Sequence, residues 1–523
     1  MARTTGSRAI TRRRFLRATL GGAGVAVSLP LLQGAATAAQ ASADAPKRGG
    51  TLRVGLYVDA VTMDPHFSGS KIDRQIYFNI YDTLVGLAPN LDIVPALAES
   101  WETPDPTTYI FKLRKGVKFQ DGTDFDANAV KVNFDRMMNP ENKSLRSGEV
   151  RSIDSVEVVD AATVKLKLKQ PDSALLATLT DRAGMMISPA AIQKFGKDLA
   201  RNPVGTGPFT YVRWQKDDHI LLKRNDAFWD RGKPYLDQVR YRVILDDSVK
   251  VNALKAGELD IMDYVQPKDV AGLKADSNLN VVDVPSLAVW WFWINTTKPP
   301  FDNKALREAL AYAIDIDTIV KRLYLGVGVP ANGPIPPASW AYDSSIPFRT
   351  RDLARAKAKL AEGGKPSGFK FVFLSNNSPI DLQVVQAVKA QVAEVGIDMD
   401  ILPVDTAKQI SDTVGKNYEA TWAQWSGRPD PDGNTYNHFY KGAGMNYGGY
   451  DNPKVNDLLN KARAVADKAQ RKQIYSEIVR SLNEDVPCIF LWHPVEPKAM
   501  LKKVQGYPAI PDGMMRFAGV WMK

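Results

Sequence analysis

The sequence is poor in the residues that most often build disulfides and metal sites. Its 523 residues include one cysteine, so no disulfide can form within the chain. The four histidines are His66, His219, His438 and His493, and no two have the i, i+4 spacing that places two imidazoles on one helix face. We therefore expect no metal site. Cys488 lies in the apolar run VPCIFL, which favours a buried small hydrophobic residue.

Signatures of catalysis are also missing. There is no Gly-x-Ser-x-Gly turn that would expose a nucleophilic serine, and no glycine-rich phosphate-binding loop. A secreted hydrolase is the least favoured function for this chain. We expect no enzymatic activity and no cofactor.

Charge is not concentrated enough to favour nucleic-acid binding. The net charge is +10, but six arginines fall within residues 1–38, which contain no Asp or Glu, so +10 less 6 leaves +4 for the rest. The remaining basic residues are interleaved with acidic ones. The alternating lysines of residues 165–169, KLKLK, are typical of the solvent-facing side of a strand.

The first forty residues read as an export signal. Residues 11–17, TRRRFLR, place paired arginines ahead of a mild apolar stretch, 18–32, which is followed by the small residues of 35–39. The apolar stretch is shorter than the ~20 residues that a membrane-spanning helix needs. The paired arginines resemble a twin-arginine signal, with the general secretory route as the alternative.

Cleavage of this signal is expected to leave a free protein. The bond after Ala38 fits the small-x-small pattern, although 39–41 and 41–43 fit it as well. No cysteine near these sites can carry a lipid, and no later segment is apolar enough to span a bilayer. We expect a soluble protein without a lipid anchor, periplasmic or extracellular, delivered by the twin-arginine export machinery.

The remaining chain alternates strand and helix patterns and is too long for one core. Expected strands cover 51–58, 369–373 and 397–404, and expected helices cover 72–84, 302–326, 382–395, 455–466 and 468–482. Strand 369–373, helix 382–395 and strand 397–404 form a βαβ unit, which favours a parallel sheet. The fold class is therefore α/β.

Several segments resemble the peptide-binding components of ATP-binding-cassette (ABC) importers, solute-binding protein family 5. They are residues 95–102 (PALAESWE), 109–119 (YIFKLRKGVKF) with 121–123 (DGT), 204–209 (VGTGPF), 225–229 (NDAFW), 256–260 (AGELD), 295–315 and 446–453 (NYGGYDNP). The string from 95 to 123 is highly specific for this family, and the resemblance covers essentially everything after the signal. Because these segments occur in the order typical of the family, the chain is identified as a member of solute-binding protein family 5.

The resemblance implies a periplasmic-binding-protein type II-like fold with two lobes that close on a ligand, and an additional inserted domain. The expected parts are the signal, 1–38; an N-terminal lobe, 47–88 with 202–290 and 495–523; the inserted domain, 89–201; and a C-terminal lobe, 291–494. Crossings between lobes are expected near 291–295 and 492–494. The expected partners are a short peptide or small-molecule ligand and an ABC permease with its ATPase, and the protein is expected to be a monomer.

Two aromatic segments are candidates for ligand contact. Residues 289–295, VWWFWIN, form a strand that places Trp291 and Trp293 on one face, where they either line the cleft or pack in the core. The resemblance puts a lobe crossing here, so Trp291, Trp293 and Asn295 are candidate ligand-binding residues. In the family, a loop that corresponds to 425–432, WSGRPDPD, reaches the cleft, which adds Trp425 to the candidates.

This loop departs from its relatives at Arg428. Dipeptide-binding relatives carry an Asp after Trp-x-Gly for the ligand amino group, and an Arg in the loop where this chain has residues 375–377, SNN. Because a guanidinium pairs well with carboxylate or phosphate, Arg428 suggests an anionic group on the ligand. The alternative is that Arg428 pairs with Asp430 or Asp432 and only shapes its own loop.

The remaining candidates are Asp430, Asn377 and His66. The segment around His66 resembles one that lies near the cleft in the family. A peptide is the family's usual cargo. Since both dipeptide anchors are absent, an opine, an oligosaccharide, a modified amino acid, or a nickel or haem complex stays open.

Overall fold

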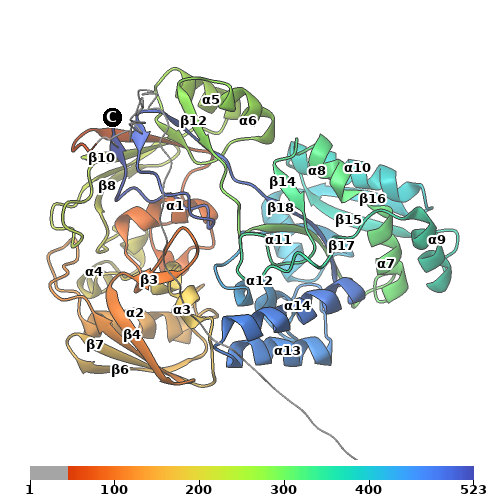
Figure 1. Ribbon diagram of the computed structural model, residues 1–523, viewed down its shortest axis with the longest axis horizontal. Coiled ribbons are helices and arrows are strands. Elements are labelled where there is room, and N and C mark those ends of the chain that lie inside the picture. The colour runs from red at the N-terminus through yellow and green to blue at the C-terminus, as the bar shows by residue number, and fades with distance from the viewer. Residues whose placement is uncertain (1–44) are drawn as a thin grey trace, which may run out of the picture. The chain divides into compact units, whose positions relative to one another are not determined.

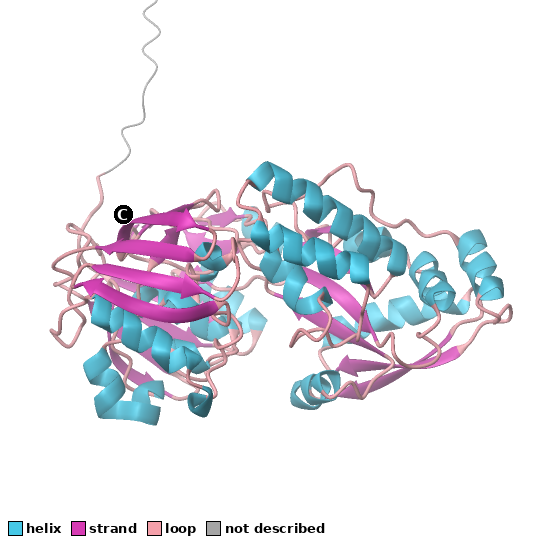
Figure 2. Cartoon of the chain, turned by 90° about the horizontal axis from the view of Figure 1, so that it is seen from below, coloured by secondary structure: helices cyan, strands magenta, loops and turns pink. Residues whose placement is uncertain are grey.

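The structure is a computed structural model that describes residues 45–523. The predicted signal, 1–38, lies outside the described residues. Residues 46–523 form one compact unit in which helices and strands alternate along the chain (Figures 1 and 2). The predicted α/β class is confirmed.

A seven-stranded mixed sheet gathers strands from both ends of the chain. Its strands in spatial order are β12 (Leu279–Val282), β19 (Lys498–Leu501), β11 (Ile261–Met262), β1 (Thr51–Leu56), β10 (Gln238–Val243), β9 (His219–Arg224) and β8 (Phe209–Gln215). The central strand β1 runs parallel to β10 and β11. Leu52, Val54 and Leu56 of β1 are fully buried and pack in the core between this sheet and its helices.

A six-stranded mixed sheet forms the second large layer. Its strands in spatial order are β14 (Gly328–Pro330), β18 (Cys488–Pro494), β13 (Val289–Ile294), β17 (Ala420–Trp425), β15 (Lys370–Asn376) and β16 (Asp398–Val404). The predicted parallel βαβ unit is confirmed, because β15 and β16 pair in parallel. Cys488 is buried in β18, as predicted.

The remaining strands form a four-stranded antiparallel sheet and two small ribbons. The antiparallel sheet has the order β4 (Ala98–Asp105), β5 (Thr108–Leu113), β7 (Thr163–Leu168) and β6 (Ile153–Asp160), and the ribbons are β2 (Val85–Leu87) with β3 (Ile93–Pro95) and β20 (Val504–Gln505) with β21 (Trp521–Met522). Alternation is confirmed in β5, where Tyr109, Phe111 and Leu113 are all buried. It is confirmed in β7 too, where Lys165 and Lys167 are partly exposed between buried residues.

Helices and short 3-10 turns pack around the sheets. They are α1 (Lys71–Ile80), α2 (Ala127–Met138), α3 (Leu175–Thr178), α4 (Pro189–Phe195), α5 (Asp247–Lys255), α6 (Pro267–Lys274), α7 (Lys304–Ala313), α8 (Ile316–Arg322), α9 (Leu353–Glu362), α10 (Pro379–Ala393), α11 (Thr406–Val414), α12 (Asp432–Phe439), α13 (Pro453–Ala464), α14 (Lys468–Asp485), η1 (Pro65–Phe67), η2 (Pro140–Asn142), η3 (Arg182–Gly184) and η4 (Gly196–Ala200). Helices α13 and α14 lie side by side in Figure 1 and contact each other.

The predicted single helix over 302–326 is wrong. The chain forms α7 and α8, with a break at Ile314 and Asp315. The Asp315 side chain accepts a hydrogen bond from Thr318 N and caps α8. The N-cap of α7 is Asn303, whose side chain accepts from Ala305 N, and not the predicted Asp302.

The chain passes between the two large sheets just outside the predicted segments. Residues 283–288 connect β12 to β13, and residues 495–497 connect β18 to β19. The two connections pair with each other through an antiparallel bridge between Pro285 and Val495. The division into lobes and an inserted domain stays a prediction.

Candidate functional site

The loop that carries Arg428 follows the carboxyl end of β17 and is held rigidly. Gly427 has a φ of +74°, and a Cβ there would lie 2.0 Å from the Leu287 carbonyl oxygen, so only glycine fits. The Asn434 side chain accepts hydrogen bonds from Arg428 N at 2.9 Å and from Trp425 Nε1 at 3.1 Å. Its amide nitrogen donates to the carbonyl of Pro334 at 2.9 Å. The conformation of the loop is therefore determined by the close approach of Gly427 to Leu287 and by the hydrogen bonds of Asn434.

The two aspartates of this loop are fully engaged in buried ion pairs. Asp430 accepts two hydrogen bonds from Arg471, at 2.7 and 2.8 Å, and Asp432 accepts two from Arg463, also at 2.7 and 2.8 Å. All four side chains are buried. The alternative in which Arg428 pairs with Asp430 or Asp432 is therefore wrong, because both carboxylates are already taken by arginines of α13 and α14.

Arg428 instead points toward acidic groups from distant parts of the chain. One terminal nitrogen donates to its neighbour's carbonyl, Gly427 O, at 2.7 Å, and the other lies 3.5 Å from Glu149 Oε1. The guanidinium stacks over the Trp425 ring, with its central carbon 4.4 Å from the ring centroid. Only 13% of the side chain is exposed, so water compensates little of its charge.

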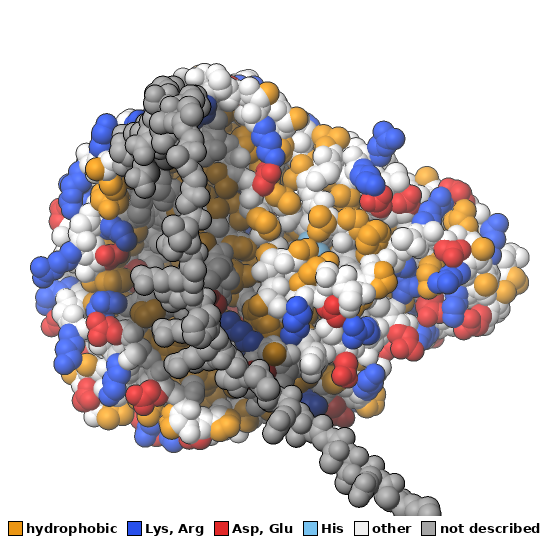
Figure 3. Space-filling model, in the orientation of Figure 1, with side chains coloured by type: hydrophobic (Ala, Val, Ile, Leu, Met, Phe, Trp, Pro, Cys, Tyr) orange, Lys and Arg blue, Asp and Glu red, His pale blue; other side chains and the backbone are white. Residues whose placement is uncertain are grey.

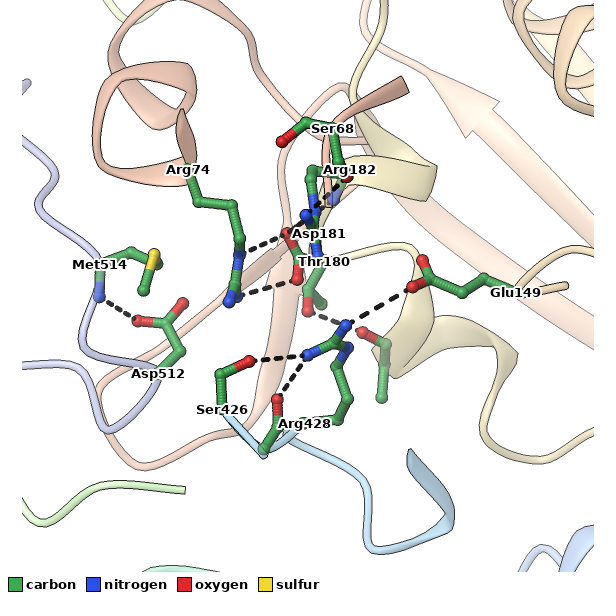
Figure 4. A network of polar contacts seen from close by, with 12 residues as sticks. Ser68, Arg74, Glu149, Thr180, Asp181, Arg182, Ser426, Arg428, Asp512 and Met514 are labelled. Atoms are coloured by element: carbon green, nitrogen blue, oxygen red, sulfur yellow. Dashed lines mark hydrogen bonds and ion pairs between the residues drawn. The ribbon is translucent and has the colours of Figure 1, made fainter. Parts of the chain in front are cut away.

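Three more buried arginines lie near this point, and we call the set Arg74, Arg146, Arg182 and Arg428 the arginine group. Figure 4 shows Arg74, Arg182 and Arg428. Arg74 forms an ion pair with Asp181 at 2.8 Å. Arg146 pairs with Glu149, and both Arg146 and Arg182 donate to the Ser68 carbonyl, at 3.1 and 2.9 Å. The residues come from α1, η3, the segment before β6 and the loop after β17.

The arginine group has more positive charge than its acidic neighbours neutralise. Burial lowers the pKa of Arg428 to about 10, against the opposing effect of Glu149 and Asp181, and it stays charged at neutral pH. Burial alone would raise the pKa of Asp181, but the surrounding guanidinium groups outweigh it and hold this pKa well below its usual range. Asp181, Glu149 and Asp73 lie nearby, and burial raises the pKa of Asp73. Asp512, which Figure 4 draws beside Arg74, is already paired with Arg516. Within the described residues, the four guanidinium groups therefore outnumber the three acids that have no cation outside the group.

The group also has unused hydrogen-bond donors. The Nε atoms of Arg146 and Arg182 are buried and have no hydrogen-bond partner among the described residues. A buried donor without an acceptor is costly, by about 1–3 kcal/mol. The excess charge and the free donors together suit an anionic ligand group.

The predicted tryptophans occupy the core. Trp291 and Trp293 are 1% and 2% exposed and pack with Phe439 and Phe490, and Trp291 and Trp293 both contact His438. The predicted alternation is confirmed, since the other two aromatics of β13 pack on the opposite face of the sheet against Trp422. Ligand contact by Trp291 and Trp293 stays a prediction.

The other predicted residues lie in different settings. Asn295 is buried and its amide donates to the carbonyl of Tyr418 at 3.1 Å. His66 is buried with its Nδ1 3.1 Å from Arg136, and burial lowers its pKa to about 4. Asn377 is exposed. The structure brings Trp425 and Arg428 together, and Asp430 of the same loop is paired with Arg471. Ligand contact by Asn295, His66 and Asn377 stays a prediction.

Sequence reasoning missed most of the arginine group. A usable signal was the charged pair Asp181-Arg182 inside the largely apolar stretch 174–187. A second was Arg74, which shares a helix with the core residues Ile72 and Ile76. Charged residues in apolar surroundings are rarely buried unless paired, so they mark a polar cluster.

Other classes of site find no support in the described part of the chain. Within residues 45–523 no three His, Cys, Asp or Glu side chains are placed to hold a metal ion. No helix in this range is long and apolar enough to cross a membrane. On the face drawn in Figure 3, basic and acidic side chains are interspersed, without a basic patch of the kind that binds nucleic acid.

Comparison with known proteins identifies the family. Residues 92–447 match the model of the bacterial extracellular solute-binding proteins, family 5. The glutathione-binding protein GsiB of Pectobacterium atrosepticum is 32% identical, over 87% of this chain and 91% of that protein.

Solved structures agree with this match. The periplasmic binding protein DppA of Helicobacter pylori, in complex with the peptide STSA, is 30% identical with a TM-score of 0.82, over 91% of this chain and 98% of its own. AgaA of A. tumefaciens R10, in complex with agropinic acid, is 29% identical with a TM-score of 0.81, over 91% and 99%. The fold is the two-lobed, type II-like fold of periplasmic binding proteins. The chain belongs to the bacterial extracellular solute-binding proteins, family 5.

Proposed function

We propose that this protein is the receptor of an ABC importer and binds a small peptide or similar organic acid through the arginine group. The observation that carries the proposal is the buried surplus of guanidinium charge around Arg428. Binding is stoichiometric, and the ligand acts by its higher affinity for the closed form of the two lobes. The protein then delivers the ligand to a permease.

The relatives narrow the class of ligand. GsiB is named for glutathione, DppA was solved with a tetrapeptide, and AgaA with agropinic acid. Glutathione, a peptide and agropinic acid are small molecules that share carboxylate chemistry. The arginine group suits that common chemistry, because guanidinium binds carboxylate through paired hydrogen bonds.

An opine-type acid is the second candidate. It is favoured by Arg428 itself, since a fixed, buried cation at this loop suits an acidic ligand that need not be a peptide. The two candidates differ in whether amide bonds are required for binding. Affinities for glutathione and for agropinic acid therefore separate them.

The test is native mass spectrometry of the purified protein, followed by calorimetry with the solute that it carries. We expect one acidic solute per chain, and at least one of glutathione, the peptide STSA or agropinic acid to bind with a Kd in the micromolar range or below. A protein that retains only neutral or cationic solutes, and binds none of these acids, would contradict the proposal. Turnover of a bound peptide would contradict the receptor function.

Three further parts of the proposal concern processing and organisation. The first 38 residues are removed after twin-arginine export, the mature protein is a monomer without a lipid anchor, and residues 89–201 form an inserted domain. N-terminal sequencing of protein from the periplasm tests the first part. Replacing Arg12 and Arg13 together with lysine should abolish export if the twin-arginine route is used.

A further inference from the structure

A second buried charge follows the neighbouring strand of the six-stranded sheet. Strands β15 and β17 are adjacent and parallel, with Phe373 opposite Ala420. Their carboxyl ends therefore lie at the same edge of the sheet, where ligands of open α/β sheets bind. Arg428 follows β17 at this edge, and Asp381 follows β15 in the first turn of α10.

Asp381 is a carboxylate without a counter-ion. It is 6% exposed, and its Oδ2 accepts one hydrogen bond, from Asn376 Nδ2 at 2.8 Å. Its Oδ1 is buried and has no hydrogen-bond partner, and no Lys, Arg or His within residues 45–523 forms an ion pair with it. Burial raises its pKa to about 6, against the opposing hydrogen bond from Asn376. At neutral pH it is mostly ionised and unpaired.

The residue that holds Asp381 is itself fixed. Asn376 Oδ1 accepts a hydrogen bond from Ser378 N at 2.9 Å, which directs the amide nitrogen toward Asp381. The Asn376 side chain therefore orients the Asp381 carboxylate through Oδ2, while Oδ1 has no hydrogen-bond partner among the described residues. A buried, unpaired carboxylate is costly unless something binds it.

The charge of this acid affects Tyr264 and Tyr324, because burial raises the pKa of both tyrosines and Asp381 raises it further. Tyr264 follows β11 and its ring lies 6.0 Å from that of Tyr57, which follows β1. Because β1 and β11 are parallel, both tyrosines follow carboxyl ends at one edge of their own sheet. Aromatic rings beside a carboxylate suit a cation, which their faces attract.

The lysines of this region lie beside other acids. Lys71 pairs with Glu496 at 2.6 Å. Lys250 lies 3.1 Å from Asp247 and 5.8 Å from the centre of the Tyr57 ring, and its buried Nζ makes no hydrogen bond within the described residues. Lys498 donates to the carbonyl of Asp263. None of these lysines forms an ion pair with Asp381, which therefore has no cationic partner among the described residues.

We propose that Asp381, with Tyr264, binds the ammonium group of a zwitterionic solute whose carboxylate binds at the arginine group. This inference rests on the proposed function and specifies its ligand: the solute carries an amine as well as an acid. The two opposite charges follow adjacent parallel strands, so a small molecule can contact both. A purely anionic acid would leave Asp381 unpaired.

The experiment compares solutes with and without their amine. The probes are glutathione and the peptide STSA, each with its free amino group and in a des-amino form that replaces this group by hydrogen, measured by calorimetry at pH 7.5. We expect the des-amino forms to bind about 10- to 100-fold more weakly, as for loss of a charge-assisted hydrogen bond. In Asp381→Asn this difference should fall below about 3-fold, while in the control Asp398→Asn, on the exposed face of β16, it should persist.

The outcomes separate the inference from the proposed function. Equal binding of both forms to the wild type would overturn the inference and leave the receptor function intact. Failure of every acidic solute to bind would overturn the proposed function, and the inference with it. Unfolding midpoints check for damage: Asp381→Asn should be as stable as the wild type or more so, because it removes a buried charge. A clear loss of stability would show that Asp381 is structural and would also overturn the inference.

Discussion

The molecule contains two sets of buried arginines that differ in how completely they are paired. Arg463 and Arg471 each have their own aspartate, bound through two short hydrogen bonds. Arg428 and its neighbours share their acids, and two of their nitrogens, Nε of Arg146 and Nε of Arg182, have no hydrogen-bond partner among the described residues. The first set is complete and supports the loop, whereas the second is incomplete and suits a ligand. Pairing, more than charge, separates structural from binding residues here.

The largest effect is expected where a complete pair is broken. Replacing Asp430 by Asn leaves Arg471 buried without its counter-ion, which should lower the free energy of unfolding by about 3–5 kcal/mol. Urea denaturation followed by tryptophan fluorescence measures this. A loss below about 1 kcal/mol would show that the pair does not support the loop as the geometry indicates.

Removing Arg428 should affect binding more than folding. Arg428→Ala removes a guanidinium from the arginine group but leaves Glu149 paired with Arg146. We expect affinity for glutathione, measured by calorimetry, to fall about 10- to 100-fold with a small change in unfolding midpoint. Arg428→Lys is the matched control, since it keeps the charge and should retain part of the affinity. Full affinity in Arg428→Ala would contradict the role given to this residue.

Sequence patterns predicted the local elements well and the assembled site poorly. The alternation of β5 and the βαβ unit of β15, α10 and β16 depend on neighbouring residues, so the sequence contains the signal. The break between α7 and α8 was missed because apolar spacing continues through Ile314 and Ile316, and only the cap at Asp315 ends the first helix.

Within the site, Arg428 was identified by its departure from relatives, but its partners were not. Arg74, Glu149 and Asp181 are hundreds of residues from it in sequence, and a charged residue gives no sign of which distant charge it will meet. The same holds for Asp430 in its loop, whose partner Arg471 is 41 positions away on α14. Such pairings appear only once the chain is folded.

A smaller effect should appear in the aromatic cluster behind the loop. Burial lowers the pKa of His438 to about 3, helped by the charge of Arg428, whereas the unfolded chain has the ordinary value near ~6.5. Between these values the unfolded state binds a proton that the folded state does not, so stability falls as pH drops. Between pH 7 and pH 5, protonation of this histidine in the unfolded state should lower the free energy of unfolding by about 2 kcal/mol.

The variant His438→Phe isolates this contribution. It keeps an aromatic ring among Trp291, Trp293 and Trp425 but cannot bind a proton. Its unfolding free energy should fall by about 2 kcal/mol less than that of the wild type between pH 7 and pH 5. The pH 7 comparison is the internal control, because His438 is neutral there. Identical pH dependence in the two proteins would contradict the buried, neutral state of this histidine.

The smallest effect is expected at an exposed pair. Lys321 and Asp317 are neighbours on α8, four residues apart, and both are exposed. Lys321→Ala should change the free energy of unfolding by at most about 0.5 kcal/mol, because solvent screens such pairs. A loss comparable to that of Asp430→Asn would show that burial does not distinguish the ion pairs of this protein.

The central claim is that the arginine group binds the acidic part of the solute. A crystal structure of the protein with glutathione, or with the solute that co-purifies, tests it most directly. We predict a solute carboxylate hydrogen-bonded to at least one guanidinium among Arg74, Arg146, Arg182 and Arg428. A bound solute whose acidic groups lie away from all four arginines would contradict it.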